Sequence, residues 1–249
     1  MDNENSIPKT SSKQANKTPK KSNTRSLTPL QQFKVSMKIG FEEWHDGIGY
    51  DIKTLKIASQ AERNAIEQIL INHSPRDWRD IEALAEINTK CARKIIKEAI
   101  KDPNPVVRLA VTRFAPDLIT ENERSQSLTD ALQTTEIFSG LSQVLLEVER
   151  YHPEEVKEAL IKGLLTRKGD VAAHFAAMLF YLFGETNEPF DMKQRSFFLR
   201  FNTEDRKERV KIFRELCQKL KIKSEKYLCL RGMTSNLIFT DSEIKSIAS

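Results

Sequence analysis

The sequence predicts an all-α protein built from a stack of paired helices. Apolar residues recur at helical spacing along most of the 249 residues, and helix-capping residues recur ahead of these stripes. No long pattern of alternating polar and apolar residues interrupts them. With 30% charged residues, eight glycines and nine prolines, the composition is typical of a soluble, helix-rich chain.

Residues 1–26 differ from the rest of the chain. They are rich in Ser, Thr, Asn and Lys and contain almost no apolar side chains, so we expect this tail to be disordered. Six basic residues against two acidic ones give the tail +4 of the net charge of +5. We favour a solvated leader over an electrostatic arm or a localisation signal at residues 17–21. The remaining body carries only +1, so its net charge does not indicate nucleic-acid binding.

Helix starts can be placed from capping residues and prolines. The expected starts, in chain order, are Leu27, Ser59, Ser74, Thr89, Thr120, Pro153 and Asn202 or Thr203, and a further helix is expected after a turn at 102–105. The segment 44–51, Trp-His-Asp-Gly-Ile-Gly-Tyr-Asp, has two glycines that predict a tight loop. The segment 171–183 is almost wholly apolar, which predicts a helix buried between neighbours.

These patterns divide the chain into a basic tail (1–26), a helical domain (27–220) and a C-terminal extension (221–249). The extension contains Tyr227–Leu230 and Leu237–Thr240, for which short strands and an extended tail are alternatives. The longest apolar run has thirteen residues, too few to span a bilayer. Three widely spaced cysteines and the lack of an apolar signal segment favour the cytoplasm.

Two helix–turn–helix units, near 97–110 and 162–176, match in outline and lie 65 to 66 residues apart. Such a period is typical of a solenoid, in which each hairpin packs against its neighbours. The segment 102–110, Asp-Pro-Asn-Pro-Val-Val-Arg-Leu-Ala, resembles the turn of a HEAT repeat. This resemblance implies a right-handed α-solenoid over roughly residues 53–185. It also implies a structural ladder in which Asp102 contacts Arg108.

The second unit departs from the HEAT pattern, because Lys168 and His174 occupy the positions of the aspartate and the arginine. We therefore expect the ladder to be broken there. The stretch 44–201 also looks like bacterial HEAT-repeat proteins of undefined activity, some of which are associated with polymorphic toxins. This resemblance implies a protein partner.

The sequence lacks motifs for a cofactor or a metal. Gly47 and Gly49 form neither a P-loop nor a dinucleotide-binding loop, so we expect no nucleotide there. The four histidines have no ligand partner at zinc-binding spacing, and we expect no metal. A pair of His45 with Asp46 has the residue types of a general base with an orienting acid. Loop hydrogen bonding is the favoured alternative.

Aromatic, histidine and charged residues of the glycine loop and of the predicted helices are the candidates for partner binding, since aromatic residues dominate binding hot spots. The candidates are Trp44, His45, Asp46, Tyr50, Trp78, Arg79 and His174. Core packing is the alternative for the aromatic residues and for His174. The charged residues from Arg76 to Lys101 are of mixed sign and predict a solvated surface.

Three functions fit these patterns. The favoured one is a protein-binding, non-catalytic scaffold that acts as an immunity protein against a bacterial toxin. The second is a HEAT-fold DNA-binding protein, such as an alkylpurine glycosylase, with Trp78 beside Asp77 or Asp80. The third is an enzyme like the bilin lyases, with Cys91 and His45 as the candidate residues.

Overall fold

The computed structural model describes residues 27–137 and 140–228. All regular structure in these two ranges is helical, which confirms the all-α prediction. The expectations for residues 1–26 and for Leu237–Thr240 lie outside the described residues. The N-terminal helices are α1 (Pro29–Ser36), α2 (Phe41–His45), α3 (Ile52–Ile57), α4 (Gln60–Asn72), α5 (Trp78–Ile87), α6 (Lys90–Ala99) and α7 (Pro105–Phe114). The C-terminal helices are α8 (Glu121–Thr134), α9 (Leu141–Arg150), α10 (Glu154–Thr166), α11 (Gly169–Leu182), α12 (Arg195–Leu199), α13 (Arg206–Lys219) and α14 (Glu225–Leu228), with 3-10 turns η1 (Pro116–Leu118) and η2 (Met192–Gln194).

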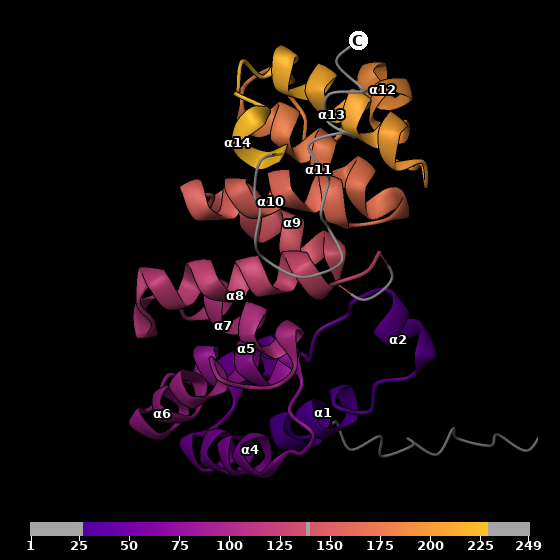
Figure 1. Cartoon of the computed structure of the whole chain (residues 1–249). Coiled ribbons are helices and arrows are strands. Elements are labelled where there is room, and N and C mark those ends of the chain that lie inside the picture. Colours follow the sequence, from indigo (N-terminus) through magenta and orange to yellow (C-terminus); the bar gives the residue numbers. More distant parts are fainter. Residues whose placement is uncertain (1–26, 138–139, 229–249) are drawn as a thin grey trace, which may run out of the picture.

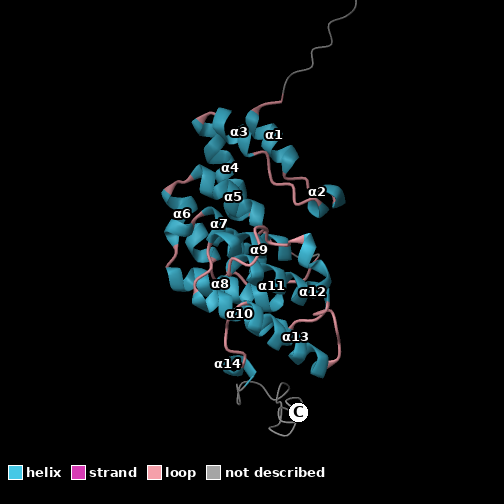
Figure 2. Cartoon of the chain, turned by 90° about the horizontal axis from the view of Figure 1, so that it is seen from above, coloured by secondary structure: helices cyan, strands magenta, loops and turns pink. Residues whose placement is uncertain are grey.

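The helices form an elongated stack with the N-terminal helices at one end and the C-terminal helices at the other (Figure 1). Within one row, α5 contacts α7, α7 contacts α9, and α9 contacts α11. A second row contains α8, α10 and α13, again in contact one after the other. α2 projects from the side of the stack in both views (Figure 2). Among the described residues, no helix combines the length and the apolar character needed to cross a membrane.

Most helix starts are set by capping residues, as predicted. Ser59 and Thr120 begin capping boxes with Glu62 and Glu123, and Asn104 caps the helix that starts at Pro105. These side chains satisfy backbone N–H groups that have no partner within the helix.

Two predicted starts are wrong. Ser74 lies in a bend, and α5 starts three residues later because Asp77 and Asp80 form its capping box. Asp205, not Asn202 or Thr203, caps α13, and its side chain accepts hydrogen bonds from the Lys207 and Glu208 N–H groups. In both cases an aspartate directly precedes the helix, whereas the predicted cap lies two or three residues further upstream.

Two hydrophobic cores meet at α7. Val107, Ala110 and Val111 face the N-terminal core, whereas Leu109 belongs to the C-terminal core. The two cores share this helix, so packing is continuous along the stack.

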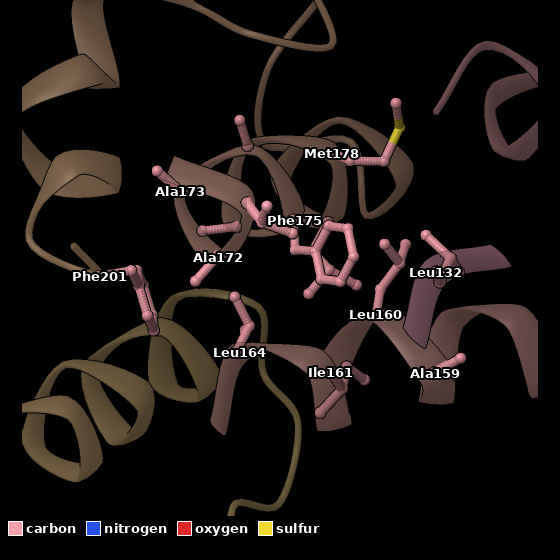
Figure 3. Packing of buried hydrophobic residues seen from close by; sticks show 14 of the residues in the cluster. Leu132, Ala159, Leu160, Ile161, Leu164, Ala172, Ala173, Phe175, Met178 and Phe201 are labelled. Atoms are coloured by element: carbon pink, nitrogen blue, oxygen red, sulfur yellow. The ribbon is translucent and has the colours of Figure 1, made fainter. Parts of the chain in front are cut away.

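The C-terminal core surrounds α11, which confirms that segment 171–183 is a buried helix. Figure 3 shows Phe175 of α11 lying against Leu160 of α10. A Cβ atom at Gly163 would lie 2.4 Å from Cε2 of Phe175, so only glycine allows this close approach. The position therefore fixes how closely α10 and α11 pack.

The Asp102–Arg108 contact differs from the one that the HEAT resemblance implies. The Arg108 guanidinium donates to the backbone oxygen of Asp102 at 2.7 Å and forms an ion pair with Asp130 of α8 at 3.7 Å. The Asp102 carboxylate instead accepts from the Asn104 N–H at 2.8 Å. Arg108 thus ties the turn before α7 to the following helix.

The described part of the C-terminal extension is helical. Residues Glu225–Leu228 form α14, so the alternative of a strand beginning at Tyr227 is wrong. Tyr227 packs edge-on against Phe213 of α13, and Lys226 forms an ion pair with Glu158 of α10. These contacts anchor α14 on the last helices.

Candidate partner-binding site

The glycine loop at residues 46–51 lies against α5. Gly47 has a φ of 66°, a conformation that disfavours side chains with a Cβ. The backbone oxygen of Ile48 accepts a hydrogen bond of 2.6 Å from Nε of Arg79. Arg79 is buried and also binds both carboxylate oxygens of Asp77 at 3.1 Å. Arg79 therefore fixes the loop to the start of α5.

A buried polar network holds the end of the same loop. The Tyr50 hydroxyl donates to the Asp80 carboxylate at 3.2 Å, and the Tyr50 ring packs edge-on against Phe33. Asp80 is fully buried, and it also contacts Nδ1 of His73 at 2.8 Å and accepts from the Asp77 N–H at 2.7 Å. Burial and the charge of Asp80 raise the pKa of Tyr50 well above its usual value, so the phenol stays protonated and donates.

A cavity of about 320 Å³ opens between this loop and helices α5, α7 and α9. We call it the Trp78 pocket, and its lining residues are Gly47, Gly49, Tyr50, Trp78, Glu82, Val106, Leu109, Ala110, Arg113, Phe114 and Gln143. The Trp78 and Phe114 rings are nearly parallel, with centroids 6.5 Å apart. The pocket thus combines an aromatic wall with a few polar groups, as ligand and hot-spot pockets do.

Glu82 is the carboxylate that faces this pocket. It lies one helical turn after Trp78, so both side chains project from the same side of α5. A Cβ atom at Gly49 would lie only 2.8 Å from Oε2 of Glu82, so glycine allows the carboxylate to lie against the loop. Burial raises the pKa of Glu82, and the charges of Arg113 and Arg79 partly counteract this shift.

Arg113 brings a positive charge to the opposite wall. Its guanidinium lies over the Phe114 ring at 5.0 Å and within 3.8 Å of Glu147 of α9. Glu147 is buried and also pairs with Arg150 at 3.0 Å. The positive charge of Arg113 is therefore partly balanced by Glu147 of the same chain.

A second cavity, of about 650 Å³, is lined by Tyr50 and Arg79. His73, Arg76 and Asn104 also line it, together with apolar residues from the α1–α2 segment. The ring nitrogen Nδ1 of His73 contacts Asp80, which orients the imidazole at the edge of this cavity. Tyr50 thus lines both cavities.

The structure brings several of the predicted partner-binding residues together. Trp78 is partly buried and lines the pocket, whereas Tyr50 and Arg79 are buried and hold the loop in place. Trp44 and His45 belong to α2, and Asp46 follows it and is exposed. The side chains of Trp44 and His45 lie outside the described residues.

His174 lies apart from this group, on α11. Its ring packs against Phe190 with centroids 5.0 Å apart, and burial lowers the pKa of its imidazole. The structure therefore places His174 in the C-terminal aromatic packing rather than beside the Trp78 pocket.

The prediction of a solvated surface from Arg76 to Lys101 is partly wrong. Arg93 and Lys94 are exposed and form surface ion pairs with Asp117 and Glu98, respectively. Arg79 and Asp80, in contrast, are buried. They are buried because the glycine loop covers the first turn of α5, a contact that a local charge pattern does not reveal.

Sequence reasoning missed the pocket-facing roles of Glu82, Arg113 and Phe114. The i, i+4 spacing of Trp78 and Glu82 was a local signal that both residues share a face. No local signal placed α7 opposite that face. The pairing of His73 with Asp80, across the bend before α5, was missed for the same reason.

The candidate residues of the glycosylase and of the lyase alternatives do not come together as those functions would require. Asp77 and Asp80 are engaged in the α5 cap and the buried network, so Glu82 is the carboxylate beside Trp78. Cys91 is exposed on α6, on the side of the stack opposite α2, which carries His45 (Figures 1 and 2). No group of His, Cys, Asp and Glu suited to a metal ion occurs among the described residues.

Comparisons with protein-family models, with curated proteins and with solved structures found no match.

Proposed function

We propose that this protein is a HEAT-like α-solenoid that binds a protein partner through the Trp78 pocket and acts without catalysis. The observation that carries this proposal is the pocket itself, where Trp78 and Phe114 form an aromatic wall beside polar groups. Pockets of this composition accept anchor side chains in protein interfaces. The succession of contacts within the two helix rows supports the solenoid.

The specific form of the proposal is a cytoplasmic immunity protein that neutralises a bacterial toxin. It rests on the resemblance of residues 44–201 to HEAT-repeat proteins associated with toxins. The glycine loop, which that resemblance includes, forms one wall of the pocket. A rigid pocket held by Arg79 and Asp80 suits tight binding, because little conformational entropy is lost on association.

The test is growth rescue in a bacterial host that expresses, one at a time, the growth-arresting proteins encoded beside this gene. We expect the full chain to restore growth and Trp78→Ala to fail at equal abundance. Lys94→Ala is the matched control, because Lys94 is an exposed residue of α6. Equal rescue by Trp78→Ala would contradict binding through the pocket, and no rescue by the full chain would contradict the immunity role.

A DNA glycosylase is the second candidate, and one observation favours it. Glu82 is a half-buried carboxylate with a raised pKa beside Trp78 and Phe114, a combination suited to holding a damaged base. The small net charge of the body weighs against it, since duplex binding needs a basic surface. Release of base from alkylated duplex DNA, abolished in Glu82→Gln, would establish this activity.

A further inference from the structure

We infer that the Trp78 pocket receives a cationic side chain of the partner protein, a lysine ammonium or an arginine guanidinium, with Glu82 as its acceptor. This inference rests on the proposed function, because it names the chemistry by which the partner is recognised. It goes beyond that function by assigning the charge of the anchor residue.

The first argument is the pairing of charges around the pocket. Arg79 pairs with Asp77, and Arg113 pairs with Glu147. Among residues 27–137 and 140–228, no lysine or arginine forms an ion pair with Glu82. The charges of Arg113 and Arg79 reach Glu82 only from beyond ion-pair distance, so a cation in direct contact with the carboxylate can still complement its charge.

The second argument is the position of the Glu82 carboxylate. It is partly withdrawn from water, and a carboxylate in such surroundings forms a stronger hydrogen bond with a cation than an exposed one. Its Oε2 lies close to the loop, since a Cβ atom at Gly49 would come within 2.8 Å of it.

The third argument is the aromatic wall. Cations are attracted to the faces of tryptophan and phenylalanine rings. The protein already places its own guanidinium groups on these rings, since Arg79 lies 4.7 Å from the Trp78 centroid and Arg113 lies 5.0 Å from that of Phe114. Both rings therefore attract guanidinium groups in this protein, and each already carries one.

An anionic ligand at Arg113 is the opposite possibility. It is disfavoured because Arg113 already faces the buried carboxylate of Glu147, and Glu82 at the pocket would repel a second anion. The volume of about 320 Å³ also suits one long side chain rather than a polymer.

The test follows the indole N–H resonance of Trp78 in the ¹H–¹⁵N spectrum of the full chain, assigned as the peak lost in Trp78→Phe. The probes are N-acetyl-arginine methylamide, N-acetyl-lysine methylamide and the neutral N-acetyl-citrulline methylamide, at constant ionic strength. We expect saturable shifts with one or both cationic probes and none with the citrulline compound. The two cationic probes distinguish guanidinium from ammonium recognition.

Glu82→Gln should weaken cation binding about tenfold or more, because hydrogen bonds to charged groups contribute roughly 1.5–3 kcal/mol. Glu86→Gln is the matched control, since Glu86 is an exposed residue of the same helix. Equal binding of the citrulline probe, or unchanged binding by Glu82→Gln, would overturn the inference. So would the absence of any shift with both cationic probes.

The two proposals fail in distinguishable ways. If Trp78→Ala abolishes growth rescue but no cationic probe binds, protein binding through the pocket stands and the cationic anchor is wrong. If cationic probes bind and the full chain rescues no host, the pocket chemistry stands and the immunity role is wrong. Binding of alkylated DNA that displaces the cationic probes would overturn a protein side chain as the occupant.

Discussion

The two halves of the stack bury charged side chains in different surroundings. The N-terminal half buries Arg79 and Asp80 beneath the glycine loop, at 2% and 0% exposure. The C-terminal half surrounds α11 with apolar residues and packs Phe197, Phe198 and their aromatic neighbours edge to face. Its buried charged residues are Glu147, which faces Arg113 of α7, and Arg209, whose guanidinium donates to the backbone oxygens of Arg167 and Thr203.

This difference separates stability from binding. Apolar packing in the C-terminal half stabilises the fold through the hydrophobic effect and close contact. Buried charges in the N-terminal half carry a desolvation cost that hydrogen bonds only offset. Their benefit is a fixed loop that forms one wall of the Trp78 pocket, so we interpret the C-terminal half as support and the N-terminal half as the binding region.

The largest expected effect is in the C-terminal core. Phe175→Ala should lower the free energy of unfolding by about 3–5 kcal/mol, because it removes a fully buried ring between α10 and α11. Urea denaturation followed by circular dichroism measures the loss. A cost below about 1 kcal/mol would show that this region is loosely packed and would remove the contrast between the halves.

Gly163→Ala sharpens this prediction. Alanine usually stabilises a helix relative to glycine by about 1 kcal/mol, but here it should destabilise, since its Cβ would lie 2.4 Å from Phe175. In the Phe175→Ala background the same change should become neutral or stabilising. A stabilising Gly163→Ala in the otherwise unchanged chain would contradict the observed packing.

The next effect concerns the buried network of the N-terminal half. Asp80→Ala should cost about 3 kcal/mol, because it leaves the Tyr50 hydroxyl and the Asp77 N–H without their acceptor. It should also release the glycine loop and broaden the Trp78 indole resonance. Glu86→Ala on the same helix is the control and should change stability by less than about 0.5 kcal/mol. Equal stabilities of the two variants would show that the network does not hold the loop.

The contrast between the halves also explains what the sequence could predict. Apolar spacing placed α11, and Ser59 and Thr120 placed their helices, because these signals are local. The burial of Asp80 and the exposure of Glu82 to the pocket depend on how a distant loop and α7 pack against α5. These contacts join residues about 30 positions apart, and no periodicity along one helix encodes them.

A smaller effect is expected at the turn before α7. Arg108→Ala should cost about 1 kcal/mol, because it removes the hydrogen bond to the Asp102 carbonyl and the partly exposed pair with Asp130. Lys94→Ala, which removes an exposed ion pair, should leave the urea midpoint almost unchanged. If Arg108→Ala lowered the free energy of unfolding as much as Asp80→Ala, the turn before α7 would contribute as much polar stabilisation as the network beneath the glycine loop.

A small change in stability is expected at Glu82, and it bears most directly on the Trp78 pocket. Burial raises the pKa of Glu82, so the folded state holds its proton more tightly than the unfolded state does. Above that raised pKa, the ionised carboxylate therefore lowers stability, and this cost disappears as the pH falls through it. Glu82→Gln should remove the cost while weakening cation binding.

The decisive measurement is the free energy of unfolding of Glu82→Gln relative to the unchanged chain, from neutral to acidic pH. We expect the variant to be more stable at neutral pH, and the difference to vanish below the usual pKa of a carboxyl group. That result would show that the ionised Glu82 carboxylate lowers the stability of the fold, as expected of an acceptor that does not serve packing. A variant that is less stable at neutral pH would show that Glu82 stabilises the fold and would contradict its assignment as an acceptor for a ligand.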